Sequence, residues 1–354
     1  MSSVEHTAAI LRGRGKVFDV TKRPTPTPGL YEVLIETKAV AINPIDHIQQ
    51  SHGFKIARYP AVLGSDVAGV VSAVGDGVLD FKIGDRVTAL APAFFMKGSP
   101  NYGAFQEKVL VPEQYVSSIP ISITYNDAAM LPLAVSTSWH AFLNLGIRKD
   151  AVYRESDKRG ILIWSAASSV GSAALQIAKS MGFYVYATAS AKHHAYLQEL
   201  GNGPGTVKLF DYHDPQLTAK ISKEAEEDGV FVEMAILANG NLKDCIKVLA
   251  KAKGRSETIA RIISVPWSMQ LIWWKMKPIW RKTSVIFVEP KGNEAEIKES
   301  YEFIFGTWLK QKLVDGGIVP SPKPFVIEGG IAAIQQGVTT WKKGVSGVKI
   351  VIEI

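Results

Sequence analysis

The sequence has a single cysteine, Cys245, among its 354 residues. One thiol excludes an intramolecular disulfide and a multi-cysteine metal cage, and such scarcity is typical of a reducing compartment. The start of the chain, MSSVEHTAAI, has no basic segment followed by an apolar core, so we expect no secretory signal. These absences favour a cytoplasmic protein.

Uninterrupted apolar runs and blocks of one charge are also absent. The most apolar stretch, residues 262–280, contains Lys275, Lys277, Pro266 and Pro278, which makes it a poor membrane span. The net charge of +7 comes from scattered Lys and Arg residues that form no basic block with interleaved aromatic residues. We therefore expect no membrane or nucleic-acid partner. With 47% hydrophobic residues, the chain can form the cores of two globular domains.

The first third of the chain alternates short apolar runs with Gly, Pro and Asp. This pattern predicts a compact β-rich domain. A helix is expected at residues 126–145, although Pro132 should break or kink it. The expected strands of this part are residues 33–41, 69–74, 85–90 and 107–111.

From residue 159 the pattern changes to strands that alternate with helices. This alternation predicts a parallel sheet with right-handed crossovers. After a predicted helix at residues 294–313, the chain returns to β structure and is expected to rejoin the first domain. The expected strands are residues 160–164, 183–187, 230–236, 260–265, 284–288, 317–327 and 348–354, and the expected helices are residues 172–181 and 192–200.

The predicted fold class is therefore α/β with two domains. Residues 1–128 and 295–354 should form the β-rich domain. Residues 129–294 should form a Rossmann domain with a doubly wound parallel sheet, inserted into the first.

The turn after the first parallel strand has the composition of a pyrophosphate site. Residues 165–171 read Ser-Ala-Ala-Ser-Ser-Val-Gly and lead from the strand into a helix. The dinucleotide fingerprint needs small residues at three offsets, which here fall on Ala166, Ser168 and Gly171. Backbone N–H groups and the helix dipole would then meet the phosphate. The alternative is an ordinary strand-to-helix turn.

The end of the next strand indicates which dinucleotide binds. An NAD site normally has Asp or Glu about 20 residues further on, but no carboxylate occurs between Asp157 and Glu199. Residues 188–194 read Thr-Ala-Ser-Ala-Lys-His-His, and their hydroxyl, ammonium and imidazole groups suit a 2′-phosphate. We predict NADPH rather than NADH. The alternative is that Lys192, His193 and His194 only begin a surface helix.

Six segments together resemble the medium-chain dehydrogenase/reductase superfamily, in that family's order and over nearly the whole chain. The resemblance implies a GroES-like β-rich domain joined to a Rossmann domain, with the active site in the cleft between them. The turn at residues 168–171, the strand end at residues 188–190 and the tripeptide at residues 210–212 look like the fungal enoyl reductases that serve polyketide synthases. The six segments are residues 40–46 (VAINPID), 63–71 (LGSDVAGVV), 84–87 (GDRV), 103–105 (GAF), 131–137 (LPLAVST) and 345–349 (VSGVK).

This resemblance implies a set of cofactor residues. The 2′-phosphate would be surrounded by Ser190, His193 and Tyr212, next to Lys192. The pyrophosphate would contact Ser168, Ser169 and Val170. The active-site loop and the cofactor would be held by Asn43, Pro44 and Asp46, although Asp46 can also be read as a turn residue. The remaining cofactor surface would be lined by Leu237, Val345, Ser346 and Lys349.

The same resemblance argues against a metal. Zinc-dependent members have Cys where Asn43 stands and a His-Glu pair where Ser65 and Asp66 stand. Zinc prefers thiolate and imidazole ligands to the amide and hydroxyl groups found here. His47 and His52 lie in a segment that we expect to be irregular, so their rings need not converge. We predict no metal site.

Without zinc, the simplest chemistry is hydride addition to the β-carbon of an activated C=C bond and protonation at the α-carbon. The resemblance places Thr137 at the start of a helix that faces the cleft, where its hydroxyl would donate to the nicotinamide or the substrate carbonyl. The alternative is a helix cap. Many relatives have a lysine where this chain has Ile48. Solvent and His47 would then handle the proton, with His47 as a general acid, unless His47 is only a surface histidine.

Aromatic residues predict a wide apolar substrate pocket for a polyketide-like or terpenoid molecule. A core or a subunit contact is the alternative for the aromatic segment at residues 266–280. The predicted pocket residues are Trp139, Trp267, Met269 and Trp273.

Together these features predict a zinc-independent, NADPH-dependent enoyl reductase of fungal secondary metabolism. Its substrate would be a small apolar enone or a carrier-bound enoyl chain, with a polyketide synthase as a partner in trans, and it would be a monomer or a homodimer. One alternative is a quinone or small-enone oxidoreductase. Another is an NADPH-binding protein with a non-redox role, such as cyclisation of a reactive intermediate.

Overall fold

The computed structural model describes residues 4–201, 207–250 and 285–354. The chain divides into two compact units, Met1–Ala134 with Glu294–Ile354 (unit 1) and Val135–Asn293 (unit 2). The first division lies within helix α3 (Pro132–Asn144), whereas we expected a domain boundary after residue 128. Unit 1 is therefore made of two separate stretches of chain and unit 2 of one.

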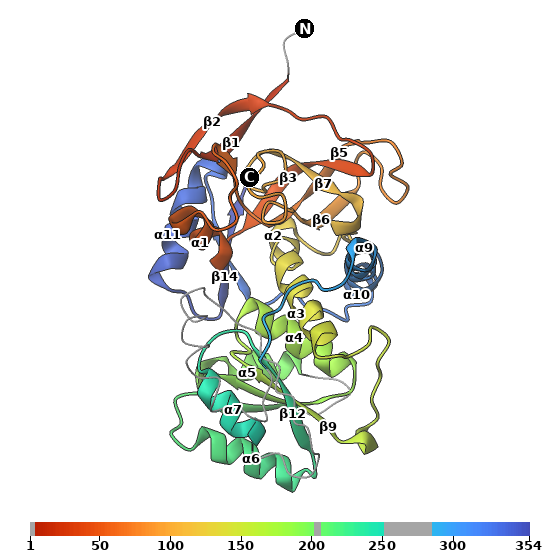
Figure 1. The fold of residues 1–354 in the computed structure, drawn as a ribbon, viewed down its shortest axis with the longest axis vertical. Helices are drawn as coiled ribbons and strands as arrows, with labels where there is room; N and C mark the ends of the chain where they lie inside the picture. Colours follow the sequence, from red (N-terminus) through yellow and green to blue (C-terminus); the bar gives the residue numbers. More distant parts are fainter. Residues whose placement is uncertain (1–3, 202–206, 251–284) are drawn as a thin grey trace. The chain divides into compact units, whose positions relative to one another are not determined.

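Unit 1 contains two β-sheets (Figure 1). One has the strand order β2-β1-β4, and the other has the order β13-β14-β3-β5-β6-β8, with β7 also paired to β3. Val351 of β14 pairs with Ala41 of β3, so the last strand joins the first third of the chain. The strands are β1 Glu5–Leu11, β2 Phe18–Pro24, β3 Glu32–Ala41, β4 Ala61–Val62, β5 Asp66–Val74, β6 Arg86–Leu90, β7 Lys108–Pro112, β8 Val116–Ser118, β13 Lys323–Ile327 and β14 Val348–Glu353.

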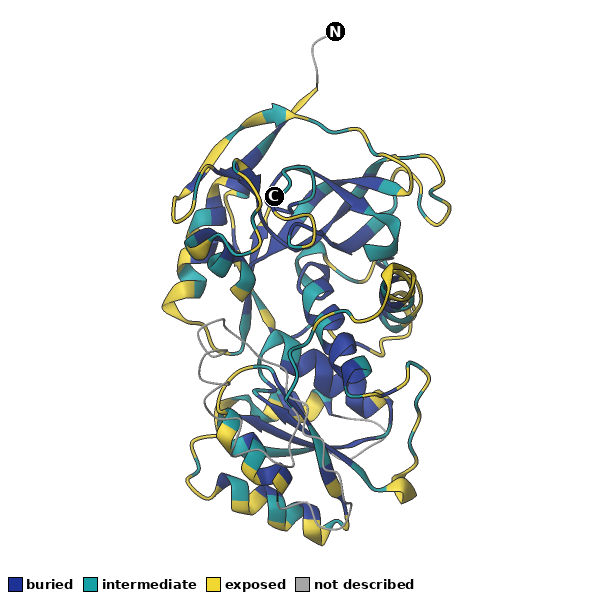
Figure 2. Cartoon of the chain, in the orientation of Figure 1, coloured by how far each residue is buried: buried dark blue, intermediate teal, exposed yellow. Residues whose placement is uncertain are grey.

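Short helices connect and cover these strands. The core between them is apolar, with Ile35, Val67 and Ile352 fully buried, and Figure 2 shows the buried positions concentrated along the strands. The helices of unit 1 are α1 Pro44–His52, η1 Glu113–Tyr115, α2 Tyr125–Ala128, α9 Glu294–Tyr301, the π-helix η6 Glu302–Leu309, α10 Lys310–Val314, η7 Gly330–Ala333 and α11 Ile334–Lys343.

Unit 2 contains a four-stranded parallel sheet of order β11-β10-β9-β12, which confirms the predicted parallel sheet. The central strands β9 and β10 are almost wholly buried, as is typical of parallel strands. Helices α4 and α5 contact each other, as do α6 and α7. The elements are η2 Glu155–Asp157, β9 Arg159–Trp164, α4 Ser169–Ser180, β10 Tyr184–Ala189, η3 Ala191–His193, α5 His194–Leu200, β11 Val207–Asp211, α6 Leu217–Glu227, β12 Phe231–Leu237 and α7 Leu242–Ala250.

The segment that we expected to be irregular is helix α1, so that prediction was wrong. Asn43 has an extended backbone at the N-cap, Pro44 begins the helix, and Gly53 ends it in the left-handed conformation at φ 68°. These are ordinary start and stop residues. The helix was missed because its buried face carries Gln49 and Gln50 rather than apolar residues.

Other predicted boundaries also need correction. The helix predicted at residues 126–145 is split, and α3 begins at Pro132 because proline lacks the N–H that an interior position requires. The helix predicted at residues 294–313 consists of three consecutive segments, the α-helix α9, the π-helix η6 and the α-helix α10. Residues 285–288 form no strand, although Val285 packs on the core of unit 2. In the segment predicted as β at residues 317–327, only Lys323–Ile327 is a strand.

Three predicted pocket residues, Trp267, Met269 and Trp273, and the strand predicted at residues 260–265 lie outside the described residues. Within the described part of the chain, none of the helices has both the length and the apolar character needed to span a membrane.

Candidate cofactor and catalytic sites

The turn after β9 is fixed to the neighbouring strand β10. Ser165 has a positive φ of 66°, which turns the chain sharply at the strand end. Its N–H donates to Oγ1 of Thr188 at 3.1 Å, and the N–H of Ala166 donates to the Thr188 carbonyl at 2.8 Å. Thr188 is fully buried, so the start of α4 is held against the sheet.

Gly171 allows helix α4 to lie close to this turn. A Cβ at this position would be 2.2 Å from the Ser165 carbonyl oxygen, which is shorter than any non-bonded contact between a carbon and an oxygen atom. Only glycine fits, which is the packing role that the fingerprint gives to its third small residue.

Ser168 caps α4 rather than offering a free hydroxyl. Its Oγ accepts the N–H of Gly171 at 3.1 Å and donates to the Ser165 carbonyl at 2.8 Å. In the described part of the chain, the N–H groups of Ser169 and Val170 have no acceptor, as expected for the first turn of a helix. These two N–H groups and the helix dipole form a site that fits a pyrophosphate.

The residues predicted for the 2′-phosphate lie around the end of β10. Ser190 is half-buried between β10 and η3, Lys192 is exposed, and His193 is half-buried. Desolvation, followed by the charges of Lys192 and His194, lowers the pKa of His193. Tyr212 is 45% exposed and thus accessible to a ligand.

Asp211 also lies at this edge, although the sequence marked it only as part of the tripeptide at residues 210–212 and indicated no role for it. It ends β11 and is the register partner of Ala189 at the end of β10. Its carboxylate accepts from the backbone N–H of His213 at 3.0 Å and contacts His213 Nδ1 at 2.8 Å, and the backbone contact is the larger cause of its lowered pKa. A count of carboxylates along the chain between Asp157 and Glu199 could not find it, because strand pairing brings it there.

The other predicted residues of unit 2 are more enclosed. Thr137 lies beyond the first turn of α3, so it is not a helix cap, and its half-buried hydroxyl makes no hydrogen bond within the described residues. Trp139 is 1% exposed and packs edge-to-face on Phe142 with ring centroids 6.3 Å apart. Leu237 ends β12 and is 2% exposed.

In unit 1 a buried polar network joins Asn43, Asp46, Asp66 and Lys349, and we call it the Lys349 network. The Lys349 ammonium donates to Oδ1 of Asn43 and lies 3.1 Å from Oδ2 of Asp66. Asn43 Nδ2 donates to the same Asp66 oxygen at 2.8 Å, and the N–H of Leu133 donates to Oδ1 of Asp66 at 2.7 Å. The Asp66 carboxylate is thus fully buried but satisfied by three donors.

Asp46 is the second carboxyl group of the network. Its Oδ2 accepts the N–H of Asn43 at 2.7 Å, while its Oδ1 is buried without a partner in the described residues. Burial raises the pKa of Asp46 to about 7, and the nearby Asp66 charge acts in the same direction. With one ammonium for two carboxyl groups, a proton on Asp46 makes the network neutral.

The Lys349 network includes two of the positions where zinc-dependent relatives have ligands. Asn43 and Asp66 both contact the ammonium, and Ser65 is buried beside them. Nowhere in residues 4–201, 207–250 and 285–354 do three or more His, Cys, Asp or Glu side chains gather as metal ligands would. The side chains at these positions are an amide, a hydroxyl and a carboxylate, and the carboxylate is already paired with the Lys349 ammonium, so they make a poor donor set for zinc.

The remaining predicted residues of unit 1 are more accessible. His47 is half-buried on α1, with its ring 5.7 Å from that of Trp341. Desolvation, followed by the charges of Lys342 and His52, lowers the pKa of His47. Pro44, Val345 and Ser346 are exposed.

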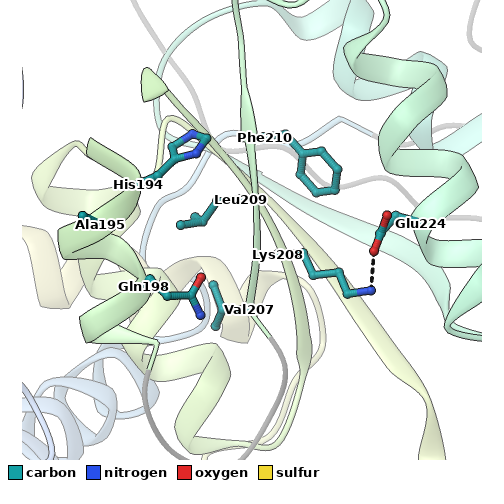
Figure 3. Close-up of a pocket in the computed structure, with 8 residues that line it drawn as sticks. All are labelled: His194, Ala195, Gln198, Val207, Lys208, Leu209, Phe210 and Glu224. Atoms are coloured by element: carbon teal, nitrogen blue, oxygen red, sulfur yellow. Dashed lines mark hydrogen bonds and ion pairs between the residues drawn. The ribbon is translucent and has the colours of Figure 1, made fainter. Parts of the chain in front are cut away.

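A hollow of about 530 Å³ lies at the outer edge of the parallel sheet in unit 2 (Figure 3). His194 and Gln198 of α5 line one side, and Lys208 of β11 forms an ion pair with Glu224 of α6 at 2.6 Å. Of the residues that the sequence offers for the 2′-phosphate, His194 lines this hollow, but Ser190, Lys192 and His193 do not. The candidate site is therefore the turn and strand ends described above.

Comparisons with known proteins identify the relatives of this chain. Residues 29–121 match the alcohol dehydrogenase GroES-like domain. The chain is 38% identical to trans-enoyl reductase tndF of Aspergillus flavipes over 99% of both chains. It is 41% identical to trans-enoyl reductase tazE of Aspergillus terreus over 75% of this chain and 87% of that protein.

Solved structures share the fold. The CurK enoyl reductase superposes with a TM-score of 0.72 at 21% identity over 99% of both chains. An alcohol dehydrogenase superfamily protein from Novosphingobium aromaticivorans gives a TM-score of 0.77 at 22% identity, also over 99% of both chains. The predicted combination of a GroES-like domain and a Rossmann domain is confirmed.

Lys349→Met should destabilise unit 1, because it leaves the Asp66 charge buried without its cation. The expected loss in the free energy of unfolding is about 3–5 kcal/mol, measured by urea denaturation. Lys343→Met, at an exposed position of α11, is the matched control and should change stability by less than about 0.5 kcal/mol. Equal effects of the two variants would contradict the stabilising role of the ion pair.

Asp46→Asn should flatten the dependence of stability on pH. Because the pKa of Asp46 rises from 3.8 to about 7 on folding, the folded chain keeps a proton in this range that the unfolded chain releases. The free energy of unfolding therefore falls as pH rises from 4 to 7, by up to about 1.4 kcal/mol per pH unit.

Urea denaturation at a series of pH values measures this slope. The amide of Asp46→Asn keeps an oxygen for the N–H of Asn43 but cannot ionise, so the variant should lose that part of the slope. Asp127→Asn, in the first turn of α2, is the control and should keep the slope. An unchanged slope in Asp46→Asn would show that Asp46 stays ionised.

Proposed function

Because the chain belongs to the family of the fungal trans-enoyl reductases, within the medium-chain dehydrogenase/reductase superfamily, we propose that it reduces an activated C=C bond with NADPH and without zinc. The substrate is an enoyl thioester or enone of fungal secondary metabolism, received in trans from a polyketide synthase. Unit 2 is the NADPH-binding domain, and unit 1 is the catalytic domain.

The observation that carries this proposal is the turn at the start of α4. Two backbone N–H groups, of Ser169 and Val170, are available there for a pyrophosphate, and Gly171 leaves the space that the turn needs. NADPH, when bound, supplies the hydride. Ser190, Lys192, His193 and Tyr212 bind its 2′-phosphate, and Leu237 packs against the rest of the dinucleotide.

The Lys349 network supports a reaction without a metal. Two of its members, Asn43 and Asp66, hold an ammonium where related dehydrogenases have metal ligands. Two of the three ammonium donors are used by these partners, and the third remains for a cofactor oxygen. In this proposal Asn43, Pro44, Asp46 and Lys349 hold the active-site loop, while Val345 and Ser346 contact the cofactor.

Thr137 is the proposed donor to the substrate carbonyl. Its hydroxyl has no partner within the described residues and is half-buried, so it can donate to an oxygen that gains negative charge during hydride addition. His47 is a weaker candidate for the proton donor, because a lowered pKa leaves its ring neutral near pH 7. Solvent then supplies the proton to the α-carbon.

The first test is NADPH consumption with enoyl thioesters, enones and quinones of matched size. The proposal expects turnover of an enoyl thioester or enone with a saturated product. Quinone turnover alone would favour the quinone oxidoreductase alternative. Binding of NADPH without its oxidation by any substrate would favour a non-redox role.

Thr137→Val should lower kcat for the enoyl substrate by about a hundredfold, because it removes a donor to the developing negative charge. Thr137→Ser retains a hydroxyl and should restore most of the activity. Steady-state kinetics with saturating NADPH measure both variants. If valine and serine variants have equal activity, the hydroxyl does not act as the donor.

The rim of β10 and β11 should set the choice between NADPH and NADH. Lys192→Gln should weaken NADPH binding by about tenfold and leave NADH binding unchanged, because it removes a charge-assisted contact to the 2′-phosphate. Asp211→Asn should shift the preference further toward NADPH, since it removes a carboxylate that repels phosphate. Calorimetry with both dinucleotides measures these ratios. Equal losses for both dinucleotides in Lys192→Gln would contradict the assignment.

A further inference from the structure

Two neighbouring loops of unit 1, one after α1 and one after β6, carry positive charge and no carboxylate. The stretches that contain them, residues 47–65 and 86–106, have no Asp or Glu. The loops are joined by a hydrogen bond from the N–H of Ala57 to the carbonyl of Lys97 at 3.0 Å. Lys55, Arg58 and Lys97 are all exposed on them.

A fourth cation lies beside these loops. The side chain of Arg14 is 3.8 Å from the position that a Cβ on Gly53 would occupy. Throughout the described ranges of the chain, no carboxylate forms an ion pair with Arg14, Lys55, Arg58 or Lys97. Unpaired cations on adjoining segments of chain attract an anion.

Lys55 and Lys97 are held in an unfavourable backbone conformation. Their φ angles are 51° and 54°, in the left-handed region where glycine is preferred. An L-residue with a side chain loses roughly 1–2 kcal/mol there. Glycine would be more stable at both positions, so the two ammonium groups are retained at a cost, as at functional sites.

Aromatic rings lie next to these cations. The Lys55 ammonium is 4.5 Å from the ring centroid of Phe94, which neighbours Phe54 at 5.8 Å and Phe95 at 5.5 Å. Phe95 is 40% exposed and Met96 39% exposed.

The row of rings continues from this surface into the interior of unit 1. The ring centroid of Phe95 is 6.1 Å from that of the buried Tyr301, and the centroid of Tyr301 is 6.3 Å from that of the buried Phe305. We call the surface formed by Arg14, Lys55, Arg58 and Lys97 with Phe54, Phe94, Phe95 and Met96 the cation–aromatic face.

We propose that the cation–aromatic face binds the phosphopantetheine arm of an acyl chain that is attached to a carrier protein. The inference rests on the proposed function, because it specifies how an enoyl thioester is held. The phosphodiester of the arm is an anion that exposed Lys and Arg side chains on these segments can bind through charge-assisted hydrogen bonds. The apolar acyl chain and thioester lie on the half-buried Phe94 and the exposed Phe95.

The test compares two thioesters of the same hexenoyl chain, one on 4′-phosphopantetheine and one on pantetheine, which lacks the phosphate. With saturating NADPH, the wild-type KM should be about tenfold lower for the phosphorylated thioester. The double variant Lys55→Gly/Lys97→Gly should lose most of this ratio, because the KM for the phosphorylated thioester rises toward that for the pantetheine thioester.

The melting temperature separates loss of binding from loss of folding. Glycine relieves the positive φ at both positions, so the double variant should melt at the same temperature as the wild type or higher. Lys22→Gln, which removes an exposed cation from β2 in the same unit, is the control and should keep the tenfold KM ratio.

Two kinetic outcomes would overturn the inference. One is that the wild type has equal KM values for the two thioesters, and the other is that the double variant keeps the tenfold KM ratio. The KM of a CoA thioester could also be lower than that of the phosphopantetheine thioester. If the double variant removes this difference, the face binds the nucleotide of CoA instead. Binding to anionic vesicles that the double variant abolishes would assign it to a membrane surface.

If no thioester oxidises NADPH, the proposed reductase function fails, but the face can still be tested. Calorimetry with 4′-phosphopantetheine alone should then show binding to the wild type and to Lys22→Gln but not to the double variant. Absence of binding to the wild type would overturn the inference about the face independently of turnover.

Discussion

The buried ion pair between Lys349 and Asp66 is the constraint on which unit 1 depends. It connects the last strand, β14, to the start of β5, and Asn43 at the beginning of α1 bonds to both partners. Since Leu133 donates to the same carboxylate, four segments that are distant in sequence meet at one charge. A buried charge with three donors tolerates little displacement of any of them.

The same network explains why the side chain of the N-cap residue Asn43 makes no capping hydrogen bond to its own helix. Its side chain is turned to Asp66 and Lys349, and Asp46 satisfies the N–H of Asn43 instead. The geometry of α1 and the ionisation of Asp46 are therefore linked. The start of a helix is usually fixed by neighbouring residues, but the start of α1 is also fixed by contacts with Asp66 and Lys349, which are distant in sequence.

Much of unit 2 could be predicted from the sequence because its signals are local. Strands β9 and β10 are buried on both faces and therefore read as short apolar runs, and the turn at residues 165–171 follows directly. Helix α1 was missed because its buried side chains are Gln49 and Gln50, which carry no apolar periodicity.

The residues of the candidate site differ in whether a local pattern in the sequence marks them. Ser168, Ser169 and Val170 share one turn, and Ser190, Lys192 and His193 share one strand end, so a contiguous pattern marks each group. Asp211 belongs to the same edge only through strand register. The contact between Lys349 and Asn43 spans 306 residues, and no local pattern reports it.

The discontinuity of unit 1 has a consequence for how the chain matures during synthesis. Unit 2 is one continuous stretch that leaves the ribosome before β13 and β14 exist, so it can fold first. Asp66, in contrast, is synthesised early and must wait for Lys349, almost three hundred residues later. Until then β3 lacks its neighbour β14 and Asp66 lacks its counter-ion, so unit 1 can complete its fold only after the last residues have been synthesised.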